Sequence, residues 1–284
     1  MPLQEMIPAA RFAGKAAIIT GGSRGIGRAT AERLGREGAR VLITGRTRAD
    51  LEAASASLTE AGVETIPMVA DVTDADALER MLGTVLERWG RIDVLVNNAG
   101  IAEAAPFLEI ERVHWDRLID VLLTGPCMLA QRCAREMARR GGGSIVNITS
   151  FLGHVTDGPY ATYGVAKAGL IALTRSIATE LAAQGVRCNS VSPGFVHTSM
   201  TESHASRELI DALNTSFTRV PIGRMLTADE IAATCAFLAS EEASGITGID
   251  LLVDGGLMAD AYAKPVMAEI ESRAAAAAAS GSAL

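Results

Sequence analysis

The stretch Thr20-Gly-Gly-Ser-Arg-Gly-Ile-Gly27 decides how the rest of the chain is interpreted. It follows a short apolar run at 16–20 and precedes a helix-length amphipathic stretch at 28–36. Glycines between a strand and a helix let the backbone turn tightly and approach a pyrophosphate, whose charge meets backbone N–H groups and the positive helix end. The stretch therefore predicts a phosphate-binding turn. An ordinary strand-to-helix turn is the alternative, because the GxxxGxG spacing departs from the general GxGxxG fingerprint.

Short apolar runs recur along the chain, at 16–20, 41–44, 66–69, 92–96, 144–148, 187–191 and 249–253. They are continuously hydrophobic rather than alternating, which is typical of strands covered on both faces of a parallel sheet. Helix-length segments separate them. The pattern predicts an α/β, doubly wound Rossmann fold with a seven-stranded parallel sheet flanked by helices. A βα barrel is the alternative, which the glycine-rich first turn disfavours.

No Pro-, Gly- or Ser-rich linker divides the chain, so we expect a single domain over 15–256. Residues 1–14 are interpreted as an N-terminal extension and 257–284 as a C-terminal tail, partly disordered. The polar, mixed stretch at 195–225 is long for a simple connection, which predicts a substrate lid there.

The composition excludes several classes of protein. Hydrophobic residues make up 49% of the 284 residues and aromatic residues 4%, which predicts a soluble globular protein with an aliphatic core. The net charge of -7 disfavours nucleic acid and anionic membranes as partners. The four cysteines form no CxxC pair and no histidine stands at metal-ligand spacing, so we expect reduced thiols, no metal site and a cytoplasmic location. We recognise no signal peptide or membrane-spanning apolar run.

The residues at the end of the second apolar run should determine whether the cofactor is NAD(H) or NADP(H). In this fold an acidic side chain there binds the ribose 2′-hydroxyl of NAD(H), whereas an arginine accepts the 2′-phosphate of NADP(H). The sequence reads Thr44-Gly-Arg-Thr-Arg48 without a carboxylate, and Arg24 offers a second cation. This pattern favours NADPH over NADH. The alternative is that Arg46 and Arg48 are solvated surface charges.

Tyr163 and Lys167 stand four residues apart in a segment predicted to be helical, so their side chains share one face. A nearby ammonium favours the phenolate, and Lys167 together with a bound, positively charged nicotinamide could lower the pKa of Tyr163 toward neutrality, which makes it a candidate general acid or base. Ser150 closes the fifth apolar run, at the sheet edge where ligands of open α/β sheets bind. Taken singly, these features also fit a surface Tyr–Lys pair and a serine that caps a turn.

The order of these motifs resembles the short-chain dehydrogenase/reductase family, in particular the single-domain branch of 3-ketoacyl-(acyl-carrier-protein) reductases. The resemblance covers about residues 15–256 and is carried by Thr20–Gly27, Asp71-Val72, Asn97-Asn-Ala-Gly100, Ser150, Tyr163-x-x-x-Lys167, Pro193-Gly194 and Asp254-Gly-Gly256. It implies an NADPH-dependent oxidoreductase that transfers hydride between nicotinamide and a carbonyl or secondary-alcohol substrate. It also implies a homotetramer.

The resemblance assigns roles to particular residues. The catalytic set would be Ser150, which polarises the substrate oxygen, Tyr163, which exchanges the proton, and Lys167, which also binds the nicotinamide ribose. The cofactor would be held by Gly21, Ser23, Arg24, Gly25, Ile26, Gly27, Arg46, Thr47, Asp71, Val72, Asn97, Ala99, Gly100, Tyr163, Lys167, Pro193, Gly194, Val196 and Thr198. Asp71 and Val72 would contact the adenine, and the residues from Pro193 onward would contact the nicotinamide.

One position departs from the family pattern. Members usually have an asparagine in a stretch resembling Asp-Val-Asn-Leu-Thr-Gly, where it anchors a water in the proton relay, but this sequence has Leu122. Leucine cannot hydrogen-bond that water. A backbone carbonyl could hold the water instead. The rival interpretation is a non-catalytic or sensor-type dinucleotide-binding protein, and Leu122 is its only support. A further enzymatic alternative, a sugar-nucleotide epimerase, is disfavoured by the glycine spacing.

The substrate pocket is expected between the lid and the segment before Tyr163. Its predicted members are Phe151, His154, Tyr160, Phe195 and Met200. The two polar side chains among them could hydrogen-bond a substrate, and the others would supply apolar contacts.

Overall fold

A computed structural model describes residues 10–202, 210–211, 213–214, 217–260 and 272 of the chain. The predicted lid at 195–225 is therefore described in part. Most of the predicted N-terminal extension and most of the predicted tail lie outside the described residues.

Seven parallel strands form one sheet in the order β3-β2-β1-β4-β5-β6-β7. The strands are β1 (Ala16–Ile19), β2 (Arg40–Gly45), β3 (Thr65–Val69), β4 (Val94–Asn97), β5 (Gly143–Ile148), β6 (Val186–Pro193) and β7 (Asp250–Val253). Each predicted apolar run coincides with one strand to within a few residues, which confirms the predicted fold. Because the strand order reverses between β1 and β4, a crevice opens there at the carboxyl ends of the strands.

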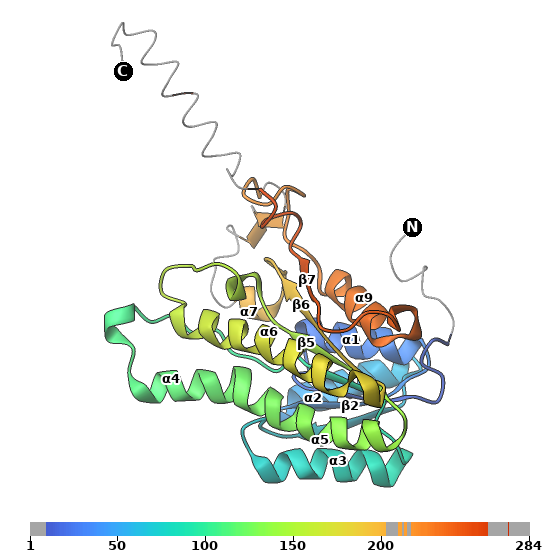
Figure 1. The fold of residues 1–284 in the computed structure, drawn as a ribbon. Helices are drawn as coiled ribbons and strands as arrows, with labels where there is room; N and C mark the ends of the chain where they lie inside the picture. The colour runs from blue at the N-terminus through green and yellow to red at the C-terminus, as the bar shows by residue number, and fades with distance from the viewer. Residues whose placement is uncertain (1–9, 203–209, 212, 215–216, 261–271, 273–284) are drawn as a thin grey trace, which may run out of the picture.

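Helices cover both faces of the sheet (Figure 1). On one face lie α1 (Gly25–Arg36), α2 (Arg48–Glu60) and α9 (Ala228–Ala239). On the other lie α3 (Ala75–Trp89), α5 (Gly125–Arg139) and α6 (Ala161–Leu181). The shorter elements are η2 (Phe107–Glu109), α4 (Arg112–Ile119), the π-helical turn η3 (Asp120–Thr124), η4 (Phe151–Gly153), η5 (Ala182–Gln184), α7 (Ser199–Glu202) and η6 (Glu241–Ala243).

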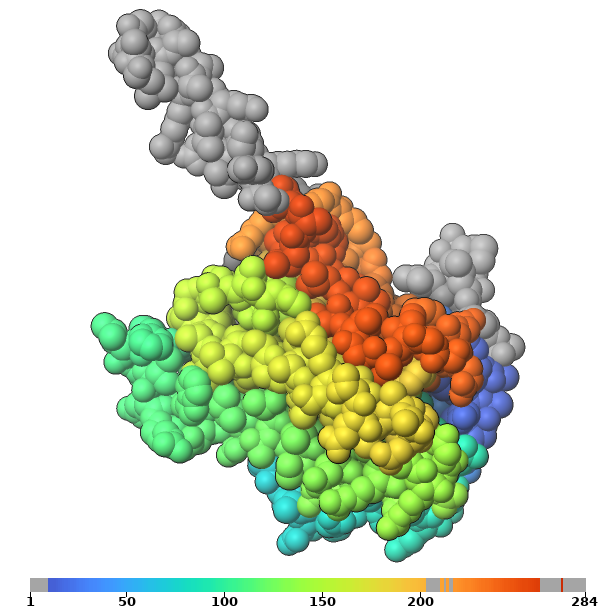
Figure 2. Space-filling view, in the orientation of Figure 1, coloured from blue at the N-terminus to red at the C-terminus, as the bar shows by residue number. Residues whose placement is uncertain are grey.

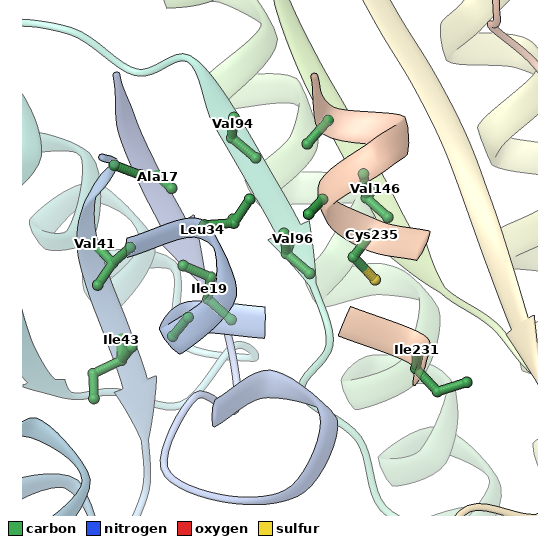
Figure 3. Packing of buried hydrophobic residues seen from close by; sticks show 14 of the residues in the cluster. Ala17, Ile19, Leu34, Val41, Ile43, Val94, Val96, Val146, Ile231 and Cys235 are labelled. Carbon is green, nitrogen blue, oxygen red and sulfur yellow. The ribbon is translucent and has the colours of Figure 1, made fainter. Parts of the chain in front are cut away.

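Small and branched aliphatic side chains fill the space between the sheet and the first helical layer. Figure 3 shows alternate residues of β1, β2 and β4 pointing toward Leu34 of α1 and toward Ile231 and Cys235 of α9. These three helical side chains are fully buried. Because successive strand residues face opposite sides, the remaining strand residues fill the second layer, and a strand with both faces covered must be apolar throughout.

Candidate active site

A cleft of about 550 Å³ opens at the carboxyl edge of the sheet. The predicted site residues that line it are Gly21, Ser23, Arg24, Gly25, Ile26, Arg46, Thr47, Asp71, Val72, Ala99, Gly100, Ser150, Tyr163, Lys167, Pro193, Gly194, Val196, Thr198 and Met200. Segments that follow six different strands, β1 to β6, thus meet at one place. Among the described residues, no cluster of His, Cys, Asp or Glu could hold a metal ion.

The glycine-rich turn has no room for side chains at Gly21, Gly22 and Gly27. A Cβ added to Gly27 would lie 2.3 Å from the carbonyl oxygen of Gly21, and one added to Gly21 would lie 2.9 Å from Nδ2 of Asn98. Gly21 and Gly25 also have φ angles of 65° and 54°, in the left-handed region that favours glycine. The backbone can therefore run close to a ligand at the start of α1, where N–H groups and the helix dipole attract phosphate.

The asparagine that supports this turn is Asn98, and the prediction named its neighbour. Nδ2 of Asn98 donates to the carbonyl oxygens of Thr20 and Gly21, at 2.9 and 3.1 Å. Asn97 points the other way, because it is the last residue of β4; its Nδ2 donates to Oδ1 of Asn147 at 2.9 Å. Asn97 is buried and does not line the cleft, and neither does Gly27. Successive side chains of a strand point to opposite sides, which explains why Asn98 contacts the turn and Asn97 does not.

Arg24 and Arg46 are both exposed and both line the cleft, as the cofactor hypothesis requires. Thr47 lies beside them at the start of α2. The structure adds Asp50, from the first turn of α2, to the same lining. The sequence prediction considered only residues 44–48 and so did not weigh this carboxylate.

Ser150, Tyr163 and Lys167 converge on the opposite wall. Ser150 follows β5 and caps the η4 turn, with the amide N–H of Leu152 donating to its Oγ at 3.1 Å. Tyr163 and Lys167 lie on α6, with Nζ of Lys167 5.6 Å from the centroid of the Tyr163 ring. Lys167 is only 4% exposed, and its Nζ donates to the carbonyl oxygen of Ile148 at 2.7 Å.

Burial controls the acid–base properties of this pair. It lowers the pKa of Lys167 from 10.5 to about 8. It also raises the pKa of the Tyr163 phenol, an effect that a hydrogen bond with Ser150 opposes. In the protein alone, removal from water is the largest effect on the Tyr163 phenol. The prediction of a lowered pKa concerned Lys167 together with a bound, positively charged nicotinamide, and for that state it stays a prediction.

Leu122 is fully buried in the wall beside these residues. It belongs to the π-helical turn η3 and packs with Leu118, Ala166 and the partly buried Tyr163. Leu122 also lines the cleft, so the position that the family usually fills with asparagine presents an apolar side chain here. The Lys167 ammonium is held by its hydrogen bond to the carbonyl oxygen of Ile148.

Four of the five predicted pocket residues do not line the cleft; Met200 does. The rings of Phe151 and Phe195 lie 5.3 Å apart and pack, with Phe217, into an aromatic cluster at the base of the predicted lid. Nε2 of His154 lies 2.7 Å from Asp250. Tyr160 precedes the first residue of α6.

Sequence analysis missed an ion pair in the cleft. Glu103 and Arg117 both line it, with an Arg117 guanidinium nitrogen 2.7 Å from Oε1 of Glu103. Nε2 of His114 lies 3.6 Å from the other carboxylate oxygen. The pair joins the loop after β4 to α4, and no local motif marks residues brought together by that loop. The other lining residues that the sequence did not single out are Ala70, Asn98, Ile101, Ala102, Val121, Ile148, Thr149, Ser199 and Thr201.

A doubly wound parallel sheet, a glycine turn at its switch point and a Ser-Tyr-Lys set at its carboxyl edge define a nucleotide-binding oxidoreductase of the α/β class. A family profile described as "Enoyl-(Acyl carrier protein) reductase" matches residues 21–258. The chain belongs to the short-chain dehydrogenase/reductase family. None of the described helices is both long and apolar enough to cross a membrane.

Named relatives support this assignment. A 3-oxoacyl-[acyl-carrier-protein] reductase, FabG, of Thermotoga maritima is 37% identical over 87% of this chain and 99% of its own length. A cis-4-hydroxycyclohexanecarboxylate dehydrogenase of Sinomonas cyclohexanicum is 39% identical over 87% of this chain and 98% of its own. The crystal structure of a short-chain type dehydrogenase/reductase from Mycobacterium marinum superposes with a TM-score of 0.82 at 33% identity, covering 88% of this chain and 97% of that one.

Proposed function

We propose that the protein is an NADPH-dependent oxidoreductase that transfers hydride between the nicotinamide and a carbonyl or secondary-alcohol substrate, with Tyr163 as the general acid or base. The observation that carries the proposal is the convergence of Ser150, Tyr163 and Lys167 on one wall of the cleft that the glycine-rich turn borders. The names of two relatives support it, since one is a reductase of a 3-oxo group and the other a dehydrogenase of a ring alcohol.

The residues present fit a dinucleotide. The turn around Gly21 and Gly27 is a cradle that a single Cβ would fill, which is what close approach of a pyrophosphate needs. Arg24 and Arg46 would hold a 2′-phosphate. The carboxylate of Asp50, which also lines the cleft, would repel that phosphate, so NADPH binding would need both arginines. Asp71 and Val72 would face the adenine, and Pro193 to Thr198 the nicotinamide.

When bound, the nicotinamide supplies or accepts the hydride. Ser150 would donate its hydroxyl hydrogen bond to the substrate oxygen and polarise the carbonyl. Because burial raises the pKa of Tyr163, its phenol carries the proton at neutral pH and is ready to donate it during reduction. Lys167 would stabilise the phenolate that remains, and its hydrogen bond to Ile148 fixes where that charge sits. In oxidation the same groups act in reverse.

A non-catalytic or sensor role remains the alternative, and the apolar surroundings of Leu122 are the observation in its favour. It is less well supported, since a sensor needs neither the buried lysine nor the Ser150 hydrogen bond to Tyr163. We further propose, from the family resemblance, a single domain over 15–256 with a lid at 195–225, a homotetramer, and a cytoplasmic location.

A substrate panel measured with both cofactors tests the function. The purified protein should oxidise NADPH faster than NADH with at least one member of a set of cyclic ketones, β-ketoacyl thioesters and keto sugars, or reduce NADP⁺ with the matching alcohols. Binding of NADPH without turnover of any of them would favour the sensor role instead.

A further inference from the structure

A buried carboxylate lies directly behind the segment that carries Ser150. Asp250, the first residue of β7, has a side chain that is only 2% exposed. Four donors converge on its two oxygens: Ser190 Oγ at 2.5 Å, His154 Nε2 at 2.7 Å, Ser192 Oγ at 2.8 Å and Thr149 Oγ1 at 2.9 Å. A carboxylate accepts at both oxygens, so it has room for all four donors. The Thr149 hydroxyl has a single hydrogen, for which the carbonyl oxygen of Val191, 2.8 Å away, also competes.

Three of these donors control the backbone around Ser150. Thr149 immediately precedes it. Ser192 also has its Oγ 3.2 Å from the carbonyl oxygen of Ser150. His154 ends the η4 turn that Ser150 caps, and its amide N–H donates to Phe151 at 2.9 Å. Asp250 therefore ties both ends of the 150–154 segment to the last strand of the sheet.

The two segments lie far apart in the sequence but side by side in the molecule. Figure 2 shows the yellow-green part of the chain around residues 150–160 against the orange-red part around residues 250–258. The His154 side chain is 29% exposed, so it closes Asp250 off from solvent at the protein surface. Among the described residues, no lysine or arginine forms an ion pair with Asp250; His154 is the group beside it that can carry a positive charge.

We propose that His154 and Asp250 form a positioning pair that holds Ser150 in place for the reaction. His154 acts through Ser150 and does not line the cleft, in contrast to the sequence hypothesis that it meets the substrate. The inference rests on the proposed role of Ser150. If the buried carboxylate lost its His154 donor, the remaining hydroxyls would shift to compensate. Thr149 and Ser192, which contact the backbone at Ser150, would then change the position of Ser150.

The test compares two substitutions of the same side chain. His154→Gln keeps an N–H donor at about the position of Nε2, whereas His154→Leu keeps the volume and removes the donor. With the substrate that the wild-type protein turns over best, His154→Leu should lower kcat about 10- to 100-fold. KM for NADPH should change by less than about twofold, and His154→Gln should retain most of kcat. Equal losses in both variants, no loss in His154→Leu, or a rise in substrate KM with kcat unchanged would overturn the proposal.

A double substitution tests whether the two residues act together. Asp250→Asn should lower kcat, and adding His154→Leu to it should cost little more, because the second change removes a donor whose acceptor is already altered. Losses that multiply would show that the residues act separately, which contradicts a pair.

Hydrogen–deuterium exchange separates this inference from the proposed function. The amides of residues 150–155 should exchange faster in His154→Leu than in the wild-type protein, and at the wild-type rate in His154→Gln, whether or not a substrate is found. Unchanged exchange in His154→Leu, or the same increase in both variants, would contradict the pair. A wild-type protein that turns over no substrate would instead contradict the proposed function.

Discussion

Lys167 Nζ donates a 2.7 Å hydrogen bond to the carbonyl oxygen of Ile148, the last residue of β5. The contact joins the helix that carries Tyr163 to the strand that ends beside Ser150. It also fixes the ammonium in a site that is almost closed to solvent, where its charge is costly. The active-site geometry thus depends on one buried lysine, whose protonation has measurable consequences.

Lys167 should make stability depend on pH in the alkaline range. Burial lowers its pKa from 10.5 to about 8. Between these values the unfolded chain binds more protons than the folded one, so this group makes the free energy of unfolding rise with pH, by up to about 3 kcal/mol. Below pH 8 both states are protonated and the cost of burial is constant. Denaturant unfolding of the wild-type protein and of Lys167→Met at pH 7 to 10 measures the difference. The stability advantage of Lys167→Met should shrink as pH rises, and an advantage independent of pH would be inconsistent with a lowered pKa.

Gly27→Ala should disrupt the glycine-rich turn. Its Cβ would lie 2.3 Å from the carbonyl oxygen of Gly21, so backbone must move, at a cost of about 1–3 kcal/mol in unfolding free energy and with loss of NADPH affinity. Gly83→Ala is the matched control, because Gly83 lies within α3 and its Cβ would meet nothing within 4 Å. That change should stabilise the helix by up to about 1 kcal/mol. Thermal unfolding and NADPH titration of both variants are the measurements. Wild-type affinity in Gly27→Ala would argue against close approach of the phosphate.

Arg46→Asp should reverse the cofactor preference. Removing a cation from a 2′-phosphate and placing a carboxylate there should raise KM for NADPH by about tenfold or more while KM for NADH stays or falls. Arg48→Asp provides the control, because Arg48 pairs with Glu52 and does not line the cleft. Steady-state kinetics with both cofactors decides the matter. If the two variants behave alike, the arginines act as general surface charge and the assignment of Arg46 is wrong.

Leu122→Asn should not improve the enzyme. An amide placed in the apolar cluster would cost about 1–3 kcal/mol of stability if it found no partner, and the anchor of Lys167 on Ile148 would persist. We therefore expect kcat to stay within about threefold of the wild-type value. Comparison of kcat and of the denaturation midpoint measures both effects. A gain in kcat of tenfold or more would mean that proton supply past Leu122 limits the natural enzyme.

The fold and most of the site could be predicted because they depend on local pattern. Continuous apolar runs located the strands, and the spacing of Tyr163 and Lys167 on one helix placed both side chains on the cleft wall. Choosing Asn98 over Asn97 required knowing which side of a strand end faces the cleft. The pKa of Tyr163 depends on burial, which no spacing reveals. The ion pair of Glu103 and Arg117 forms only once the loop after β4 is folded.

The packing of the residues predicted for the substrate pocket could not be predicted from the sequence either. Phe151 and Phe195 lie on different strand connections, and their ring contact turns both away from the cleft lining. His154 meets a carboxylate 96 residues away in sequence. Contacts of this range follow from sheet order and loop packing, and no sequence motif encodes them.

The central claim is that Tyr163 moves the proton, and Tyr163→Phe tests it most directly. The measurement is turnover of the best substrate by the variant, together with its NADPH dissociation constant from fluorescence titration. The account predicts a loss of kcat of about 100-fold or more, with the dissociation constant within about threefold of the wild-type value, since the ring still packs while the hydroxyl is gone. Turnover within about threefold of the wild-type rate, with NADPH bound normally, would contradict the account.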